Sequence, residues 1–510
     1  MKKFIASLVT FTIIATTITA QPTFITDSLT NYINQGLKDW QVPGLAIAIV
    51  KDGKVVLSKG FGVDNIVTKT PVDAATLFFI ASNTKLFTGT ALANLEYEKK
   101  LSLNDKISKY YPTYKLYDKN SSDLVTIKDM LTHRIGTTTF QGDFTFWNTK
   151  LSRSQIMERM QYLKPTNAFR DVYGYCNSCF LTAGQIIPKV TNQTWEDYIA
   201  KTIVQPLQMT NTYTSSNGIQ NRVQHIATPY TTSFTNTLQQ VPYDEWDNLG
   251  PAASIVSNVT DMSHWLQLQL DSGKYQGKQI LPWPVLQKTR DVNIITSSRK
   301  SSVLPIHFRG YGLGVFVADY NGKQIYWHTG GAAGMVSNVC FVPEINLGIV
   351  ILTNNDNQNF FELLRYQILD AYLGVAYTNR STKPLQGFNA DMQQQVAEVT
   401  TWKNIAYNYE PNLPNTNTAY QNYVGTYTNK LYGTIKITVK DRGLLVTFEN
   451  HQNLTATLLP MPNNEWLLTY SNIEFGIFKT KFTLNKTTVK SLTIKANDFV
   501  EYDAYEFVKK

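Results

Sequence analysis

A serine and a lysine stand three residues apart in the segment IASNTKLF, as Ser82 and Lys85. Residues with this spacing share one face of a helix, so the Lys85 amine would lie over the Ser82 hydroxyl if a helix begins here. A serine hydroxyl is a weak nucleophile until a base takes its proton, and a buried lysine can lose its charge and act as that base. The pattern also arises by chance, because Ser297 and Lys300 share it.

A tyrosine and an asparagine form a second candidate pair, Tyr175 and Asn177, in the segment YGYCNSCFLTAGQII. A phenol can shuttle a proton between a serine and a leaving group, and an amide can hold a lysine or a substrate carbonyl. Tyr175 stands out because it precedes an apolar stretch with helical spacing, between the other two sites. The same Y-x-N pattern also begins at Tyr32, Tyr420, Tyr427 and Tyr470.

A third candidate is the run His328, Thr329, Gly330 and Gly331, at the end of a predicted strand. Small residues there would let a substrate backbone lie alongside the strand, and backbone N–H groups could hold an oxyanion together with that of Ser82. The alternatives are a strand-end histidine without a role and a glycine bulge.

The elements that must position these residues are predicted from hydrophobic periodicity. Residues 27–40 have the spacing of an amphipathic helix, and residues 44–62 read as a hairpin with a Lys-Asp-Gly-Lys turn. Strands are predicted again from residue 312, followed by a helix over 357–375. We therefore expect one antiparallel sheet flanked by helices, an α/β fold, with a mostly helical subdomain in the middle of the chain.

The chain of 510 residues is long enough for two domains. Residues 1–20 read as a secretory signal peptide, which predicts a secreted or periplasmic protein without stable membrane insertion; an uncleaved anchor is the alternative. Residues 21–375 form the predicted catalytic domain and 376–418 a linker. Residues 419–510 alternate with period two, which predicts a small all-β sandwich or barrel. This domain could bind a ligand, cover the active site or drive oligomerisation.

Composition narrows the classes of partner. The net charge is +9, but the basic residues are scattered, so we expect a solvated surface and no nucleic-acid binding. Three cysteines, Cys176, Cys179 and Cys340, do not make a complete disulfide framework, and their pairing is left open. No metal site or cofactor is predicted.

S-x-x-K, then Y-x-N, then H-T-G, in this order, resembles the signature of the serine β-lactamase and penicillin-binding protein family. Residues 24–375 are similar to the branch with class C β-lactamases, D-alanyl-D-alanine carboxypeptidases and related esterases. The segments VPGLAIAIVKDGKVVLSKGFG, MLTHRIGT and GPAASIVSNVTDMSHWL add to this likeness. The last part resembles a lipocalin-like β domain.

The resemblance implies that Ser82 is acylated, and that Lys85 and Tyr175 move its proton and later activate water. It implies that Asn177 orients the substrate. It also implies that His328, Thr329 and Gly330 form the strand against which the substrate lies, and that Gly331 shares the oxyanion hole with Ser82.

We expect an exported serine hydrolase that cleaves an amide or ester, in particular a peptide containing D-amino acids, such as a cell-wall peptide. His328 replaces the lysine usual in dedicated β-lactamases, which favours peptidase or esterase activity. An esterase or weak β-lactamase is the alternative within the family. A penicillin-binding or sensing protein that does not turn over is the alternative of another class.

Overall fold

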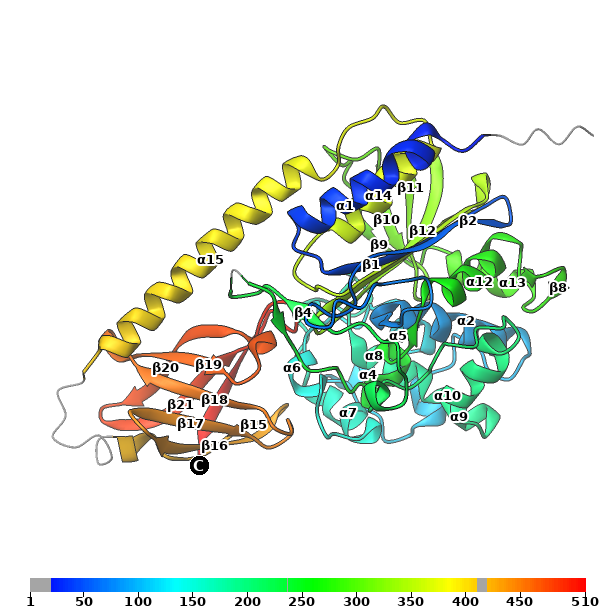
Figure 1. Cartoon of the computed structure of the whole chain (residues 1–510). Helices are drawn as coiled ribbons and strands as arrows, with labels where there is room; N and C mark the ends of the chain where they lie inside the picture. The colour runs from blue at the N-terminus through cyan, green and yellow to red at the C-terminus, as the bar shows by residue number, and fades with distance from the viewer. Residues whose placement is uncertain (1–19, 236, 411–419) are drawn as a thin grey trace, which may run out of the picture.

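A computed structural model describes residues 20–235, 237–410 and 420–510. It contains two parts, an α/β part and a β barrel, which lie side by side and are joined by one long helix (Figure 1). The predicted signal peptide falls almost wholly outside the described residues. Within the described ranges, no helix has the length and apolar character required to cross a membrane.

The α/β part is built on one antiparallel sheet of eight strands in the order β2-β1-β14-β13-β12-β11-β10-β9. The first hairpin therefore pairs with the last strand of this part, so the sheet joins segments that are some 300 residues apart in the sequence. The strands are β1 (Gly44–Lys51), β2 (Lys54–Gly62), β9 (Ile294–Ser297), β10 (Arg309–Tyr311), β11 (Phe316–Tyr320), β12 (Lys323–Ala332), β13 (Met335–Val342) and β14 (Leu347–Thr353).

Both faces of this sheet are covered by helices, which confirms the predicted fold class. Successive side chains of a strand point to opposite faces. In β1, Leu45 and Ile47 join the core under α1 (Leu29–Asp39) and α14 (Phe360–Tyr372), whereas Ala46 joins the core on the other side. Figure 1 shows α1 and α14 together on one face. A strand buried on both faces reads as a continuous apolar run, as GLAIAIV does.

The opposite face packs against the helical subdomain expected in the middle of the chain. Its helices are α2 (Thr84–Tyr97), α3 (Ile107–Tyr110), α4 (Lys119–Leu124), α5 (Ile127–Leu131), α6 (Asp143–Phe146), α7 (Arg153–Arg159), α8 (Asn177–Gly184), α9 (Ile186–Thr191), α10 (Trp195–Ile199), α11 (Gly250–Ala253), α12 (Val259–Leu270) and α13 (Trp283–Arg290). Short strand pairs also lie here: β3 (Phe78–Phe79) with β6 (Val256–Ser257), β4 (Tyr230–Thr231) with β5 (Gln239–Gln240), and β7 (Lys274–Tyr275) with β8 (Lys278–Gln279).

The C-terminal part is a closed barrel of eight antiparallel strands in sequence order, so of the two predicted architectures, sandwich and barrel, the barrel is found. The last strand pairs with the first, which leaves no free sheet edge. The strands are β15 (Gly425–Asn429), β16 (Gly433–Lys440), β17 (Gly443–Phe448), β18 (Thr455–Pro460), β19 (Glu465–Tyr470), β20 (Ile477–Asn485), β21 (Thr488–Lys495) and β22 (Ala504–Lys509).

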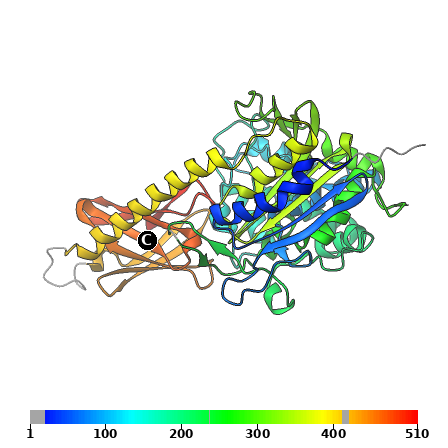
Figure 2. The same cartoon turned by 45° about the horizontal axis from the view of Figure 1, so that its top comes forward.

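The segment predicted as a linker contains α15 (Thr382–Asn408), a helix of 27 residues. Figures 1 and 2 show it running from the sheet to the barrel. Its barrel end is held by packing, since Val399 and Ala406 join a small core with Leu467 of β19. The segment is therefore a structural bridge with tertiary contacts of its own.

The α/β part also inserts a side chain into the barrel. Phe144 of α6 is 1% exposed, and its ring lies within 5.1 to 6.3 Å of six aromatic rings of the barrel part. The rings are those of Tyr432, Phe448, His451, Tyr470, Phe475 and Tyr505. The two parts therefore share a core at this point.

Candidate active site

Ser82 sits in a turn that is anchored to the sheet. The turn, Ala81–Asn83, is one 3₁₀ turn that leads directly into α2. The amide of Asn83 donates to Ser337 Oγ at 2.8 Å, and that hydroxyl donates to the Ile80 carbonyl at 2.8 Å. Ala81 has a φ of 48°, in the left-handed region, which is strained for a residue with a side chain. Such strain is held only where the surroundings fix the backbone, as they do here.

Lys85 lies one turn further along, fully buried, with three oxygen atoms around its amine. Its Nζ is 3.0 Å from Ser82 Oγ, 2.7 Å from Asn177 Oδ1 and 3.0 Å from the carbonyl oxygen of Ala252. The amide and backbone carbonyls can only accept hydrogen bonds. A neutral amine that donates to these two still has a lone pair for the Ser82 proton.

Burial lowers the pKa of the Lys85 amine from 10.5 to about 7, and the Asp143 carboxyl opposes this shift. Asp143 reaches the amine through Asn177, whose Nδ2 donates to Asp143 Oδ2 at 2.7 Å. This bond fixes which end of the amide faces Lys85. Burial also raises the pKa of the Asp143 carboxyl well above its ordinary value.

Tyr175 lies against the same amine. Lys85 Nζ is 4.7 Å from the centre of the Tyr175 ring, and the ring of His133 packs on it at 4.4 Å. Burial raises the pKa of the Tyr175 phenol, while the neighbouring Ser82 side chain lowers it. The phenol therefore keeps its proton near neutral pH and is suited to donating it.

His328 is buried and neutral. Burial, with a further contribution from Lys85, lowers the pKa of the His328 imidazole to about 3. Its Nδ1 is 2.6 Å from the Thr329 carbonyl oxygen, which can only accept, so Nδ1 carries the proton. Nε2 then accepts from the Tyr311 hydroxyl at 2.9 Å. No fixed positive charge is present at this position of β12.

The end of β12 is open on one side. Strand β13 pairs with β12 from Tyr326 to Ala332, whereas β11 pairs with it only from Lys323 to Trp327. An extended substrate can therefore lie along His328 and the residues after it. Gly330 lets β12 approach the turn before Ser82, because a Cβ there would lie 2.1 Å from the Ile80 carbonyl oxygen.

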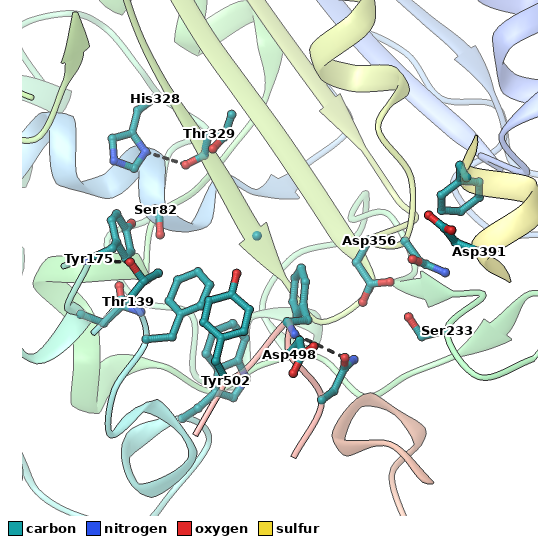
Figure 3. A pocket seen from close by; sticks show the side chains of 18 of the residues that line it. Ser82, Thr139, Tyr175, Ser233, His328, Thr329, Asp356, Asp391, Asp498 and Tyr502 are labelled. Carbon is teal, nitrogen blue, oxygen red and sulfur yellow. Dashed lines mark hydrogen bonds between the residues drawn. The ribbon is translucent and has the colours of Figure 1, made fainter. Parts of the chain in front are cut away.

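These residues surround one cavity of about 670 Å³ (Figure 3). Ser82 and Tyr175 lie close together on one side of it, His328 and Thr329 lie above them, and Asp356 and Asp391 lie at the far side. The cavity is also lined by α15 and by the barrel loop between β21 and β22, which contribute Phe388, Asp391, Met392, Gln395, Asn497, Asp498, Phe499 and Tyr502.

The structure brings the predicted residues together. The cavity is lined by Ser82, Tyr175, Asn177, His328, Thr329 and Gly331. Lys85 contacts Ser82 directly, and Gly330 packs behind the turn that carries Ser82. The other S-x-x-K pair begins at the end of β9 and does not line this cavity.

Four supporting groups were not predicted as functional: Asp143, Tyr311, His133 and the carbonyl of Ala252. His133 and Ala252 stand in segments whose likeness to the family was noted, which was a signal for them. Asp143 and Tyr311 belong to no motif, so only the tertiary contacts identify them. The three cysteines are buried and free, and Cys176 Sγ lies 3.2 Å from Ser178 Oγ.

Family models match both parts of the chain. The family model described as Beta-lactamase matches residues 29–373, and a model described as a domain of unknown function, DUF3471, matches residues 411–509. The chain is 30% identical over 341 residues to "Protein flp" of Staphylococcus aureus (strain MRSA252), covering 66% of this chain and 64% of that protein. The match thus spans just under two thirds of that curated relative.

Two further relatives extend the comparison. "Unguisins hydrolase ungD'" of Aspergillus campestris (strain IBT 28561) is 25% identical over 397 residues, covering 75% of this chain and 71% of that protein. A solved structure, the octameric penicillin-binding protein homologue from Pyrococcus abyssi, is 20% identical with a TM-score of 0.59, covering 95% of this chain and 100% of that chain. At this identity the likeness concerns the fold.

Proposed function

The chain belongs to the beta-lactamase family, and on that premise we propose that it is a serine hydrolase that forms an acyl-enzyme on Ser82. The observation that carries the proposal is the contact of 3.0 Å between Ser82 Oγ and the buried Lys85 amine. An amine with a pKa of about 7 is neutral in a large fraction of molecules at neutral pH and can take the serine proton.

In the first half of the reaction, Lys85 takes the Ser82 proton and the serine oxygen attacks the substrate carbonyl. The backbone N–H groups of Ser82 and Gly331 hold the resulting oxyanion. The Tyr175 phenol gives its proton to the leaving group as the tetrahedral intermediate collapses, and the Lys85 ammonium returns a proton to the phenol. An ester of Ser82 remains.

In the second half, water attacks this ester. Lys85, again neutral, accepts the water proton with Tyr175 as relay, and the acid product leaves as the proton returns to Ser82. No net charge is gained or lost over the cycle, and Asn177 holds the lysine amine in place throughout.

The substrate is proposed to be an amide or ester, with a D-amino-acid-containing peptide as the first candidate. Three carboxylates, Asp356, Asp391 and Asp498, line the cavity, and its described lining includes no lysine or arginine. The His328 imidazole is neutral, so it adds no positive charge to the cavity. The described lining therefore offers no cation to a substrate carboxylate, which supports esters as the second candidate and weighs against β-lactams.

The N-terminal pattern of the sequence supports export as part of the proposal. Secretion of the full chain, with cleavage after Ala20, is tested by N-terminal sequencing of the protein recovered outside the cell. An intact N-terminus on the cell-associated protein would contradict export.

A fluorophosphonate probe tests the function itself, because it reacts with an activated serine regardless of substrate. We expect the wild type to be labelled and Ser82→Ala not to be labelled. Ser297→Ala, which alters the other S-x-x-K pair, should be labelled like the wild type. Turnover is then measured with D-amino-acid amides, short esters and β-lactams. Absence of label on the wild type would refute the proposal, and a burst without turnover of any substrate would favour a sensing protein.

A further inference from the structure

The barrel loop between β21 and β22 forms part of the catalytic cavity. Four of its residues line the same cavity as Ser82: Asn497, Asp498, Phe499 and Tyr502. Figure 3 shows Asp498 and Tyr502 facing this cavity across from Tyr175. The loop belongs to a different part of the molecule from the nucleophile, and no sequence motif marks it.

Phe499 lies directly on the strand that would bind the substrate. A Cβ built on Gly331 would be 3.0 Å from Phe499 Cζ and 3.2 Å from Cε2, so the phenyl ring occupies the space into which a side chain at this position would point. The ring of Trp147 lies on Phe499 with centroids 6.1 Å apart. Phe499 thus stands beside β12 at the residue that follows the His-Thr-Gly run, where β11 no longer pairs with the strand.

The loop is held in this position by the α/β part. The Glu501 carboxylate accepts hydrogen bonds from the backbone N–H groups of Gly142 at 2.8 Å and Phe144 at 2.9 Å, and from the Tyr505 hydroxyl at 2.8 Å. Burial raises the pKa of this Glu501 carboxyl to about 7. A buried carboxyl with three donors is a strong local constraint on a backbone two residues from Phe499.

A second bond holds the loop on the far side of Glu501. The Thr138 hydroxyl donates to Asp503 Oδ2 at 3.2 Å, next to the segment that carries Phe140. Val500 is fully buried, and the backbone N–H of Glu501 donates to the Asn497 carbonyl at 3.0 Å. The loop is therefore a fixed wall of the cavity.

We propose that Phe499 is a specificity-determining residue, which limits the length of the substrate portion that extends along β12 past Gly331. This inference rests on the proposed acyl-enzyme function. The enzyme should favour substrates with a short group on that side of the scissile bond, and the barrel acts as a selectivity element of the active site.

The test uses the full-length chain and compares wild type with Phe499→Ala. Two ester series are measured: p-nitrophenyl acetate, butyrate and octanoate vary the acyl group, while the acetates of ethanol, butanol and octanol vary the leaving group. We expect Phe499→Ala to raise the ratio of kcat/KM for the longest to the shortest ester by about tenfold or more in one of the series.

Tyr423→Ala is the matched control, because Tyr423 is a partly buried aromatic residue of the barrel that contacts Trp466 and Phe482 instead of the cavity. It reports the effect of weakening the barrel without changing the cavity wall. Its ratio of kcat/KM for the longest to the shortest ester should equal that of the wild type in both series. All variants are titrated with the fluorophosphonate probe, so that rates refer to reactive Ser82.

An unchanged length ratio in both series for labelled Phe499→Ala would overturn the inference and leave the proposed function intact. An equal change in Tyr423→Ala would also overturn it, since barrel stability would then explain the effect. Failure of the wild type to react with the probe would remove the proposed function and this inference together.

Discussion

The rate of Ser82 acylation should depend on the protonation of Lys85. Burial lowers the pKa of this amine to about 7, and only its neutral form can accept the serine proton. The acylation rate should therefore rise with pH, with a midpoint near 7, and level off above it. The sign follows from the group: a lowered lysine pKa means that the active form is lost as the pH falls.

The size of the effect follows from the same shift. With a pKa of about 7, the neutral fraction is about one half at pH 7, about one tenth at pH 6 and about one hundredth at pH 5. At the ordinary value of 10.5 only about one lysine in 3,000 would be neutral at pH 7. Burial of Lys85 thus increases the population of its basic form at neutral pH by about three orders of magnitude.

The assay is the pseudo-first-order rate of fluorophosphonate labelling from about pH 5 to about pH 9, which isolates acylation from deacylation. Lys85→Arg keeps a positive charge but cannot act as a base, so its labelling rate should be about 10²- to 10⁴-fold below that of the wild type at every pH. The exposed Lys201→Arg is the matched control and should keep the wild-type profile. Circular dichroism of each variant checks that it is folded.

A labelling rate that does not change between about pH 5 and about pH 9 would refute the reasoning. A rate that still rises steeply at the upper end would identify the Tyr175 phenol as the base, because the pKa of this phenol is raised. A Lys85→Arg variant that is folded and reacts at the wild-type rate would show that the amine has no such role.

Two further predictions concern the surroundings of the site. Burial raises the pKa of the Asp244 carboxyl to about 7. The stability that this carboxyl contributes is therefore complete below its pKa in the unfolded chain and is lost as the pH rises through about 7. The melting temperature of Asp244→Asn should fall less than that of the wild type between about pH 5 and about pH 8, and equal slopes would contradict this. Gly330→Ala should slow labelling by about tenfold or more, because its Cβ would lie 2.1 Å from the Ile80 carbonyl oxygen. The control is Gly387→Ala in α15, where a Cβ meets nothing within 4 Å. This variant should be labelled like the wild type, and its free energy of unfolding should rise by about 0.5–1 kcal/mol. If Gly330→Ala is labelled at the wild-type rate, the turn that carries Ser82 can move away from β12.

The sheet and the candidate catalytic cluster could be predicted from the sequence because both leave local signals. Strand β1 lies in the segment predicted as a hairpin and α1 in the segment predicted as an amphipathic helix, so local sequence patterns were enough to place them. The roles of Tyr175 and His328 needed the order of three motifs, since each motif alone recurs or has an ordinary structural explanation. The order of the motifs implied that these residues meet near Lys85, but only the tertiary structure shows the contacts.

The parts that escaped prediction depend on contacts between distant segments. Asp143 acquires its place from a bond to Asn177, and α6 has only four residues, too short for a periodic signal. Phe499 lies about 170 residues after the glycine that it covers, in a loop without a motif. Helix α15 lies in the segment predicted as a linker, and Asp391 and its neighbours line the cavity because of where the two ends of this helix are fixed.

The insertion of Phe144 into the barrel has a consequence for how the molecule is completed during synthesis. Its aromatic partners extend to Tyr505 on β22, the strand that closes the barrel by pairing with β15. Ser82, Lys85 and Tyr175 are therefore synthesised long before the barrel residues that enclose Phe144. A chain from which β22 has not yet emerged lacks the Tyr505 ring that packs on Phe144, so the core shared by the two parts is complete only when β22 joins the barrel.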